Sequence, residues 1–159
     1  LFSWFICVWL TLAVNDLFWS SFMRVKKAVE NIWQRLAVGQ EYRTPDDVKG
    51  VKFRVLTVEP NLITIRTVGK PEEGRLGSEI SITRTSFEAA LTYLYSHKHD
   101  LNNPCEIKSN NNTLRAGPLC VAARTPNNGT RCINYILPVF KSCALVGING
   151  GYRNRAWFV

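Results

Sequence analysis

The feature that most constrains the fold of this chain is a set of three short segments in which apolar and polar residues alternate. A helical pattern follows the third segment directly. A period of two residues is typical of a half-buried strand. Residues 52–58 alternate in this way, and residues 62–68 follow after the turn Glu59-Pro60-Asn61, which predicts a hairpin. A third strand is expected at residues 79–83, after a charged loop at residues 70–78. These segments predict a small antiparallel sheet.

Two helical patterns flank this sheet in the sequence. Residues 24–38 carry apolar side chains at helical spacing, and Gly39 is expected to end that helix. The second helix should follow the third strand directly, because Thr85-x-x-Glu88 has the pattern of a capping box. Its core-facing stripe consists of Phe87, Ala90, Leu91, Leu94 and Tyr95. Helices packed on a small sheet predict an α+β fold, with residues 41–50 as a polar loop.

Beyond residue 100 the pattern changes to helix, turn, helix and hairpin. The elements expected there are a short strand at residues 105–109, a helix at 118–124, a longer helix at 131–143, and strands at 145–148 and 156–159. Thr130 is expected to cap the longer helix, and Pro138 interrupts it. Asn149-Gly150-Gly151 predicts a tight turn between the last two strands. Residues 23–100 and 101–159 are expected to form one compact domain.

The net charge of +8 is concentrated toward the carboxyl end. Residues 101–159 contain seven Lys and Arg residues and one acidic residue, Glu106, whereas residues 23–100 hold thirteen basic and ten acidic residues. A local excess of this kind is typical of a surface that faces a polyanion. It favours nucleic-acid binding by the C-terminal region over a charge spread for solubility.

The order of these elements is that of a winged helix-turn-helix, in which the second helix enters the major groove and the hairpin forms a wing. Arg131, Asn134 and Lys141 are the polar residues expected on the groove-facing helix. Arg115 and Arg124, beside the first helix, are expected to contact phosphates. Arg153 and Arg155, two residues apart on a strand of the wing and so on one face, are expected to contact phosphates or the minor groove.

Three segments of this region resemble small winged helix-turn-helix modules that accompany bacterial restriction and mobile-element proteins. They are Ala116–Arg124, Ile133–Pro138 and Ala144–Ile148. The resemblance implies a bacterial protein with double-stranded DNA as its partner, and a component or fragment of a restriction system. It says nothing about catalysis. The expected location is the cytoplasm. We predict no small-molecule substrate, and a homodimer is left open as the binding unit.

Two other functions remain open from the sequence. A restriction-type endonuclease would hold Mg²⁺ with Asp46 and Glu106, with Lys108 beside the scissile phosphate. A structural or protein-interaction domain would use the basic residues only as a solvated surface. No other metal site is expected, because Cys105, Cys120, Cys132 and Cys143 have no zinc-binding spacing, and buried thiols of a reducing compartment are the simpler interpretation.

Residues 1–22 differ from the rest of the chain, since they contain no Lys or Arg and are almost unbroken apolar sequence up to Val14. This run is shorter than the roughly 20 residues that a spanning helix needs. We expect residues 1–22 to lie outside the native fold, with Met23 as the translation start and the upstream residues from a fragment or an over-long reading frame. A hydrophobic anchor is the alternative.

Overall fold

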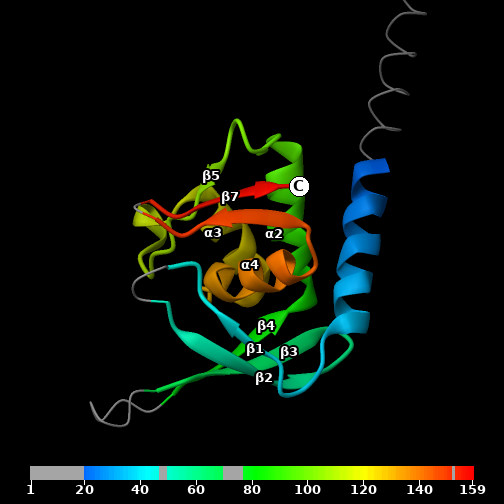
Figure 1. The fold of residues 1–159 in the computed structure, drawn as a ribbon, viewed down its shortest axis with the longest axis vertical. Helices are drawn as coiled ribbons and strands as arrows, with labels where there is room; N and C mark the ends of the chain where they lie inside the picture. Colours follow the sequence, from blue (N-terminus) through cyan, green and yellow to red (C-terminus); the bar gives the residue numbers. More distant parts are fainter. Residues whose placement is uncertain (1–19, 47–49, 70–76, 152) are drawn as a thin grey trace, which may run out of the picture.

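A computed structural model describes residues 20–46, 50–69, 77–151 and 153–159 of the chain. The fold is α+β, as the sequence predicts, and it contains two small antiparallel sheets with helices packed between and beside them (Figure 1). The expectations for residues 1–19 and for most of the charged loop at 70–78 lie outside the described residues. Within the described part, no helix is both long and apolar enough to cross a membrane.

The first sheet has four strands in the order β1-β2-β3-β4. These strands are β1 (Glu41–Arg43), β2 (Lys52–Val58), β3 (Leu62–Thr67) and β4 (Glu79–Thr83). The predicted hairpin and third strand are therefore confirmed, with Phe53 and Val55 buried as their alternation indicates. β1 corrects the prediction of a loop at residues 41–50, because Glu41, Tyr42 and Arg43 pair with β2. A three-residue strand is too short for its alternation to be recognised in a sequence.

Two helices cover this part of the molecule. Residues 20–35 are helical, and the chain turns through Gly39, whose φ of 90° lies in the left-handed region that glycine favours. Helix α2 (Arg84–Ser96) follows β4 without a break. The predicted capping box is wrong: Thr83 is the N-cap residue, its hydroxyl lies 2.7 Å from that of Ser86, and Glu88 pairs with Lys26 instead.

The second sheet has three strands in the order β5-β7-β6, with helices inserted between β5 and β6. Its elements are β5 (Cys105–Glu106), the 3-10 turn η2 (Thr113–Arg115), α3 (Pro118–Arg124), the 3-10 turn η3 (Thr125–Asn127), α4 (Ile133–Ser142), β6 (Val146–Asn149) and β7 (Arg155–Phe158). Cys132, not Thr130, occupies the N-cap position of α4, without a side-chain capping hydrogen bond, so the predicted cap is wrong. The β6–β7 connection is longer than the predicted turn at residues 149–151, because pairing resumes only at Asn149 and Arg155.

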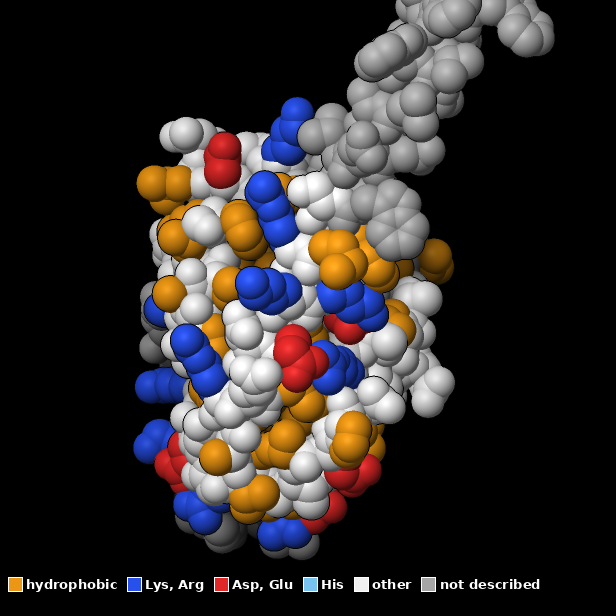
Figure 2. Space-filling view, turned by 90° about the vertical axis from the view of Figure 1, so that its right-hand side faces the viewer, with side chains coloured by type: hydrophobic (Ala, Val, Ile, Leu, Met, Phe, Trp, Pro, Cys, Tyr) orange, Lys and Arg blue, Asp and Glu red, His pale blue; other side chains and the backbone are white. Residues whose placement is uncertain are grey.

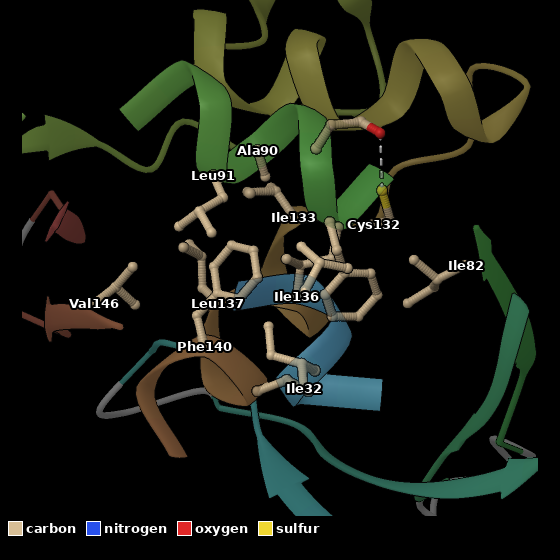
Figure 3. Close-up of a cluster of buried hydrophobic side chains, with 14 of the residues drawn as sticks. Ile32, Ile82, Ala90, Leu91, Cys132, Ile133, Ile136, Leu137, Phe140 and Val146 are labelled. Carbon is tan, nitrogen blue, oxygen red and sulfur yellow. Dashed lines mark hydrogen bonds between the residues drawn. The ribbon is translucent and has the colours of Figure 1, made fainter. Parts of the chain in front are cut away.

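Helix α4 lies between the two sheets at the centre of the core (Figures 1 and 3). The Phe140 ring packs edge-on against Phe87 of α2, with centroids 5.7 Å apart, and Tyr135 packs edge-on against Phe53 of β2 at 5.2 Å. Trp33 of the N-terminal helix meets the same Phe87 ring at 5.0 Å. One continuous apolar core therefore joins the first sheet, the second sheet and the helices.

Gly147 is required by the packing of the second sheet. It lies opposite Trp157 across β6 and β7, and a Cβ atom at this position would come within 2.2 Å of the indole ring. Gly147 lies within β6, in agreement with the strand predicted at residues 145–148. The absence of a side chain at this position lets the Trp157 ring lie on the strand.

Candidate nucleic-acid interface

Ion pairs between described side chains lie in the first part of the chain, between residues 26 and 88. They are Lys26–Glu88, Arg54–Glu41, Arg66–Glu79, Arg84–Glu30 and the more distant Arg84–Glu88. The hydrogen bond and charge of Arg54 lower the pKa of the Glu41 carboxyl, and Arg84 lowers that of Glu30 in the same way. The cations in these pairs already have carboxylate partners.

The cations of residues 101–159 are arranged differently. Lys108, Arg115, Lys141 and Arg155 are exposed, and none of them lies within ion-pair distance of a described carboxylate. These side chains are held by their position on the fold and not by acidic neighbours. Their charge is therefore available to an anionic ligand.

The pairing of β5 with β7 brings several of these residues onto one surface. In the strand register, Glu106 of β5 lies opposite Arg155 of β7, and Cys105 lies opposite Ala156. Cys105 and Ala156 are buried, so the side chains of Glu106 and Arg155 point outward. The pairing continues beyond β5, since the Ile107 amide donates to the carbonyl of Asn154 at 2.6 Å. Ile107 is buried and Lys108 exposed, so Lys108 shares the outward side with Glu106 and Arg155. One carboxylate thus lies among the cations of this surface.

Arg115 lies close to the same surface. The chain reverses after η2, and the Gly117 amide donates to the Lys108 carbonyl at 2.8 Å. Segment 107–117 and the β6–β7 connection both lie at the left end of the molecule in Figure 1. We call Lys108, Arg115 and Arg155 the wing surface.

Arg124 is a structural residue and not a surface cation. Only 9% of its area is exposed. Its guanidinium donates to the carbonyl of Gly129 at 2.7 Å and to the carbonyls of Asn110 and Asn111 at 3.1 to 3.3 Å. The expectation that Arg124 contacts DNA phosphate is therefore corrected, because its donors are occupied by three backbone carbonyls.

Helix α4 does not have the exposure that a groove-reading helix needs. Six of its ten residues are buried, and at 100° per residue they occupy most of its circumference. Arg131 precedes the helix and is half-buried, Asn134 is half-buried, and Lys141 is exposed near the other end. A helix enclosed between two sheets cannot also enter a major groove, so the prediction that these three residues line such a groove is wrong.

The placement of Arg153 also differs from the expectation. It was expected on a strand, two residues from Arg155 and on the same face. The residue lies instead in the β6–β7 connection, before β7 begins, with a φ of 64°. The alternation of a strand does not apply there, and the side chain cannot be assigned to the face of Arg155 on that ground.

The three residues of the endonuclease alternative are divided between the two sheets. Glu106 and Lys108 lie two residues apart on one outward side, which is the arrangement that the alternative requires. Asp46 instead lines a cleft of about 430 Å³ together with Tyr42 of β1, Lys141 of α4 and Gly150. Strand β7 and strand β6 lie between Glu106 and that cleft. Among the residues described, no three His, Cys, Asp or Glu side chains are grouped to hold a metal ion.

The four described cysteines are free thiols, and three of them are buried. Burial raises the pKa of Cys132 to about 12 and that of Cys105 to about 11. The Cys132 thiol donates to the Ala123 carbonyl at 3.4 Å (Figure 3). A protonated, buried thiol is a poor nucleophile, so the packing role expected for these residues fits their surroundings.

Several cations with exposed charge lie outside the region that the sequence analysis selected. Arg24, Lys27 and Arg35 lie on the N-terminal helix, and Arg43 lies at the end of β1. The near balance of charge in residues 23–100 gave no indication of these exposed cations. Their acidic neighbours in the sequence form ion pairs with other cations in the folded chain. One available indication was spacing, since positions 24, 27 and 35 fall on the same side of a helix.

No family model matches this sequence, and neither a curated protein nor a solved structure shows significant similarity to it.

Proposed function

We propose that this protein binds double-stranded DNA through the wing surface. The observation that carries the proposal is the set of exposed cations Lys108, Arg115 and Arg155, which lie on neighbouring segments and have no ion-pair partner among the described residues. Contacts between such cations and phosphates release counterions from DNA, which favours binding at low salt. Glu106 limits the local charge but leaves the surface net positive.

The arrangement of the second sheet supports this proposal. The elements follow one another as α2, β5, α3, α4, β6 and β7, and β7 lies between β5 and β6. Within this series, α3, α4 and the β6–β7 hairpin follow the element order of a winged helix-turn-helix. The resemblance noted in the sequence adds a bacterial restriction system, in the cytoplasm, as the setting that we propose.

The burial of α4 changes the mode of binding that we propose. Phosphate contacts position a protein on DNA, whereas base-edge contacts in the groove carry sequence information. Since α4 is enclosed by the core, the wing surface supplies contacts of the first kind only. We therefore propose binding with little preference for sequence.

The test is the salt dependence of duplex binding, measured by fluorescence anisotropy with a labelled duplex of mixed sequence and the full chain. Replacing both Lys108 and Arg155 with alanine should weaken binding and reduce the slope of log K against log salt by about two. The matched control is Arg66→Ala, which removes an exposed cation that Glu79 already pairs. Undetectable binding at low ionic strength, or an equal loss in the control, would refute the proposal.

A further inference from the structure

Three neighbouring clefts join into one groove across the face of the molecule. The cleft of about 430 Å³ at β1 and the β6–β7 connection shares Tyr42 and Ser142 with a second cleft of about 330 Å³. The second shares Ile32, Arg35 and Cys143 with a third cleft of about 270 Å³. The groove therefore runs from Gly150 to the N-terminal helix, and neither Lys108 nor Arg155 lines it.

Cations line this groove along its whole length. They are Arg24, Lys27 and Arg35 on the N-terminal helix, Lys141 on α4 and Arg43 on β1. All five are exposed. Figure 2, which views the side of the N-terminal helix, shows Lys and Arg side chains spread down most of that face.

The acidic residues in the groove do not cancel this charge. Glu41 and Asp46 are the carboxylates among the described residues that line it. Glu41 accepts two hydrogen bonds from Arg54, which lies outside the groove, so its charge is matched elsewhere. The five cations therefore leave the groove with a strong positive excess.

The cations of the N-terminal helix form a row that is longer than a single phosphate. Eleven residues separate Arg24 from Arg35, which corresponds to about 16 Å along a helix axis. Arg24 is held by a hydrogen bond to the Tyr95 hydroxyl at 3.1 Å, and Arg43 by one to the Gly50 carbonyl at 3.1 Å. A ligand that satisfies the whole row must be an extended polyanion, because a single phosphate reaches only part of it.

The small volume of the clefts favours one nucleic-acid strand over two. Clefts of about 270 to 430 Å³ have no room for a duplex, which is itself large enough to take a whole α-helix into its major groove. Tyr42 lies where the first two clefts meet, half-exposed, with its ring stacked on Phe53 at a centroid distance of 5.5 Å. A positively charged groove with a fixed aromatic ring is the usual arrangement for binding single strands.

We infer that this groove binds a single strand of nucleic acid, with phosphates on the five cations and one base against Tyr42. The inference does not depend on duplex binding by the wing surface, because the two surfaces use different residues. A protein with both surfaces would bind a duplex next to an unpaired strand.

The experiment measures binding of a labelled fifteen-nucleotide oligo(dT) to the full chain at low salt by fluorescence anisotropy. The triple variant R24A/K27A/R35A should lose roughly tenfold or more in affinity, and its salt slope should fall by about two. Lys26→Ala is the matched control, since Lys26 lies on the same helix but pairs with Glu88. Circular dichroism establishes that each variant is folded.

Tyr42 provides a second, independent readout. Tyr42→Leu should weaken oligo(dT) binding about fivefold or more, whereas Tyr42→Phe keeps the ring and should bind as the parent does. If Tyr42→Leu fails to fold, the triple variant still decides the matter, because its expected loss of affinity does not depend on Tyr42. An equal loss in Lys26→Ala, or equal competition by polyglutamate, would overturn the inference in favour of general anion binding.

The two surfaces can fail separately. Loss of oligo(dT) binding in the variant lacking Lys108 and Arg155, with no loss in the triple variant, would overturn the groove inference and leave the wing surface as the nucleic-acid site. Single-strand binding that depends on the helical cations, with no duplex binding at any salt concentration, would support the groove and remove only the proposed function.

Discussion

The four-stranded sheet and the three-stranded sheet share one core, yet they differ in how their charges are arranged. Around the first sheet, Arg54, Arg66 and Arg84 each have a carboxylate partner. Around the second, Lys108 and Arg155 have none among the described residues. The comparison teaches that net charge along a sequence does not locate a binding surface, because pairing in space decides which cations remain available.

The largest expected effect comes from a change in the core that both sheets share. Phe140→Ala removes a fully buried ring that contacts Phe87, and it should lower the free energy of unfolding by about 3–5 kcal/mol. If the core is one cooperative unit, the amides of β2 and β7 should lose protection from hydrogen exchange to the same extent. Hydrogen exchange followed by mass spectrometry measures this, and a loss confined to one sheet would show two separately folding units.

A smaller effect should separate a structural cation from an available one within the C-terminal region. Arg124→Lys keeps the charge but loses the planar, forked set of donors that reaches three carbonyls at once, so urea unfolding should show a loss of about 1–3 kcal/mol. Arg115→Ala, at an exposed site, should change stability by no more than about 0.5 kcal/mol. Duplex affinity should fall only in Arg115→Ala. The opposite assignment of the two effects would contradict our description of Arg124.

The smallest effect concerns pH and the paired charges of the first sheet. Arg54 lowers the pKa of Glu41, so the contribution of this pair is present above the pKa of the unfolded chain and is lost as pH falls through the lower folded value. Nuclear magnetic resonance should show the Glu41 carboxyl titrating below its usual range. In Arg54→Gln the carboxyl should return to that range. An unchanged titration curve in the variant would mean that the pair is not formed in solution.

Local sequence patterns were sufficient to predict the helices and strands in which the apolar spacing repeats several times. The stripe from Val25 to Leu36 and the alternation of Phe53 and Val55 predict a helix and a strand whose buried faces are those observed. The patterns were not sufficient at element ends. Thr83 and Cys132 occupy the N-cap positions in place of Thr85 and Thr130, because tertiary contacts decide where each helix begins.

The candidate sites were harder to predict than the fold. Lys108, Arg115 and Arg155 follow from composition, since they lie in a segment with one acidic residue. Arg124 was assigned to the wrong role, because a sequence cannot show that three carbonyls will converge on a guanidinium. The groove was missed because Lys141 joins the cations of residues 24–43 only in the folded chain.

The sequence by itself determined the α+β fold class, the two hairpins and the excess of positive charge, since these depend on residue type and on spacing within a few turns. Only the tertiary structure decided that α4 is enclosed in the core and that the N-terminal helix lies along a groove with β1 and α4. The physical reason is that burial and ion pairing are properties of segments brought together by packing. A surface made in this way is specified by the whole chain, and no single segment of it carries the pattern.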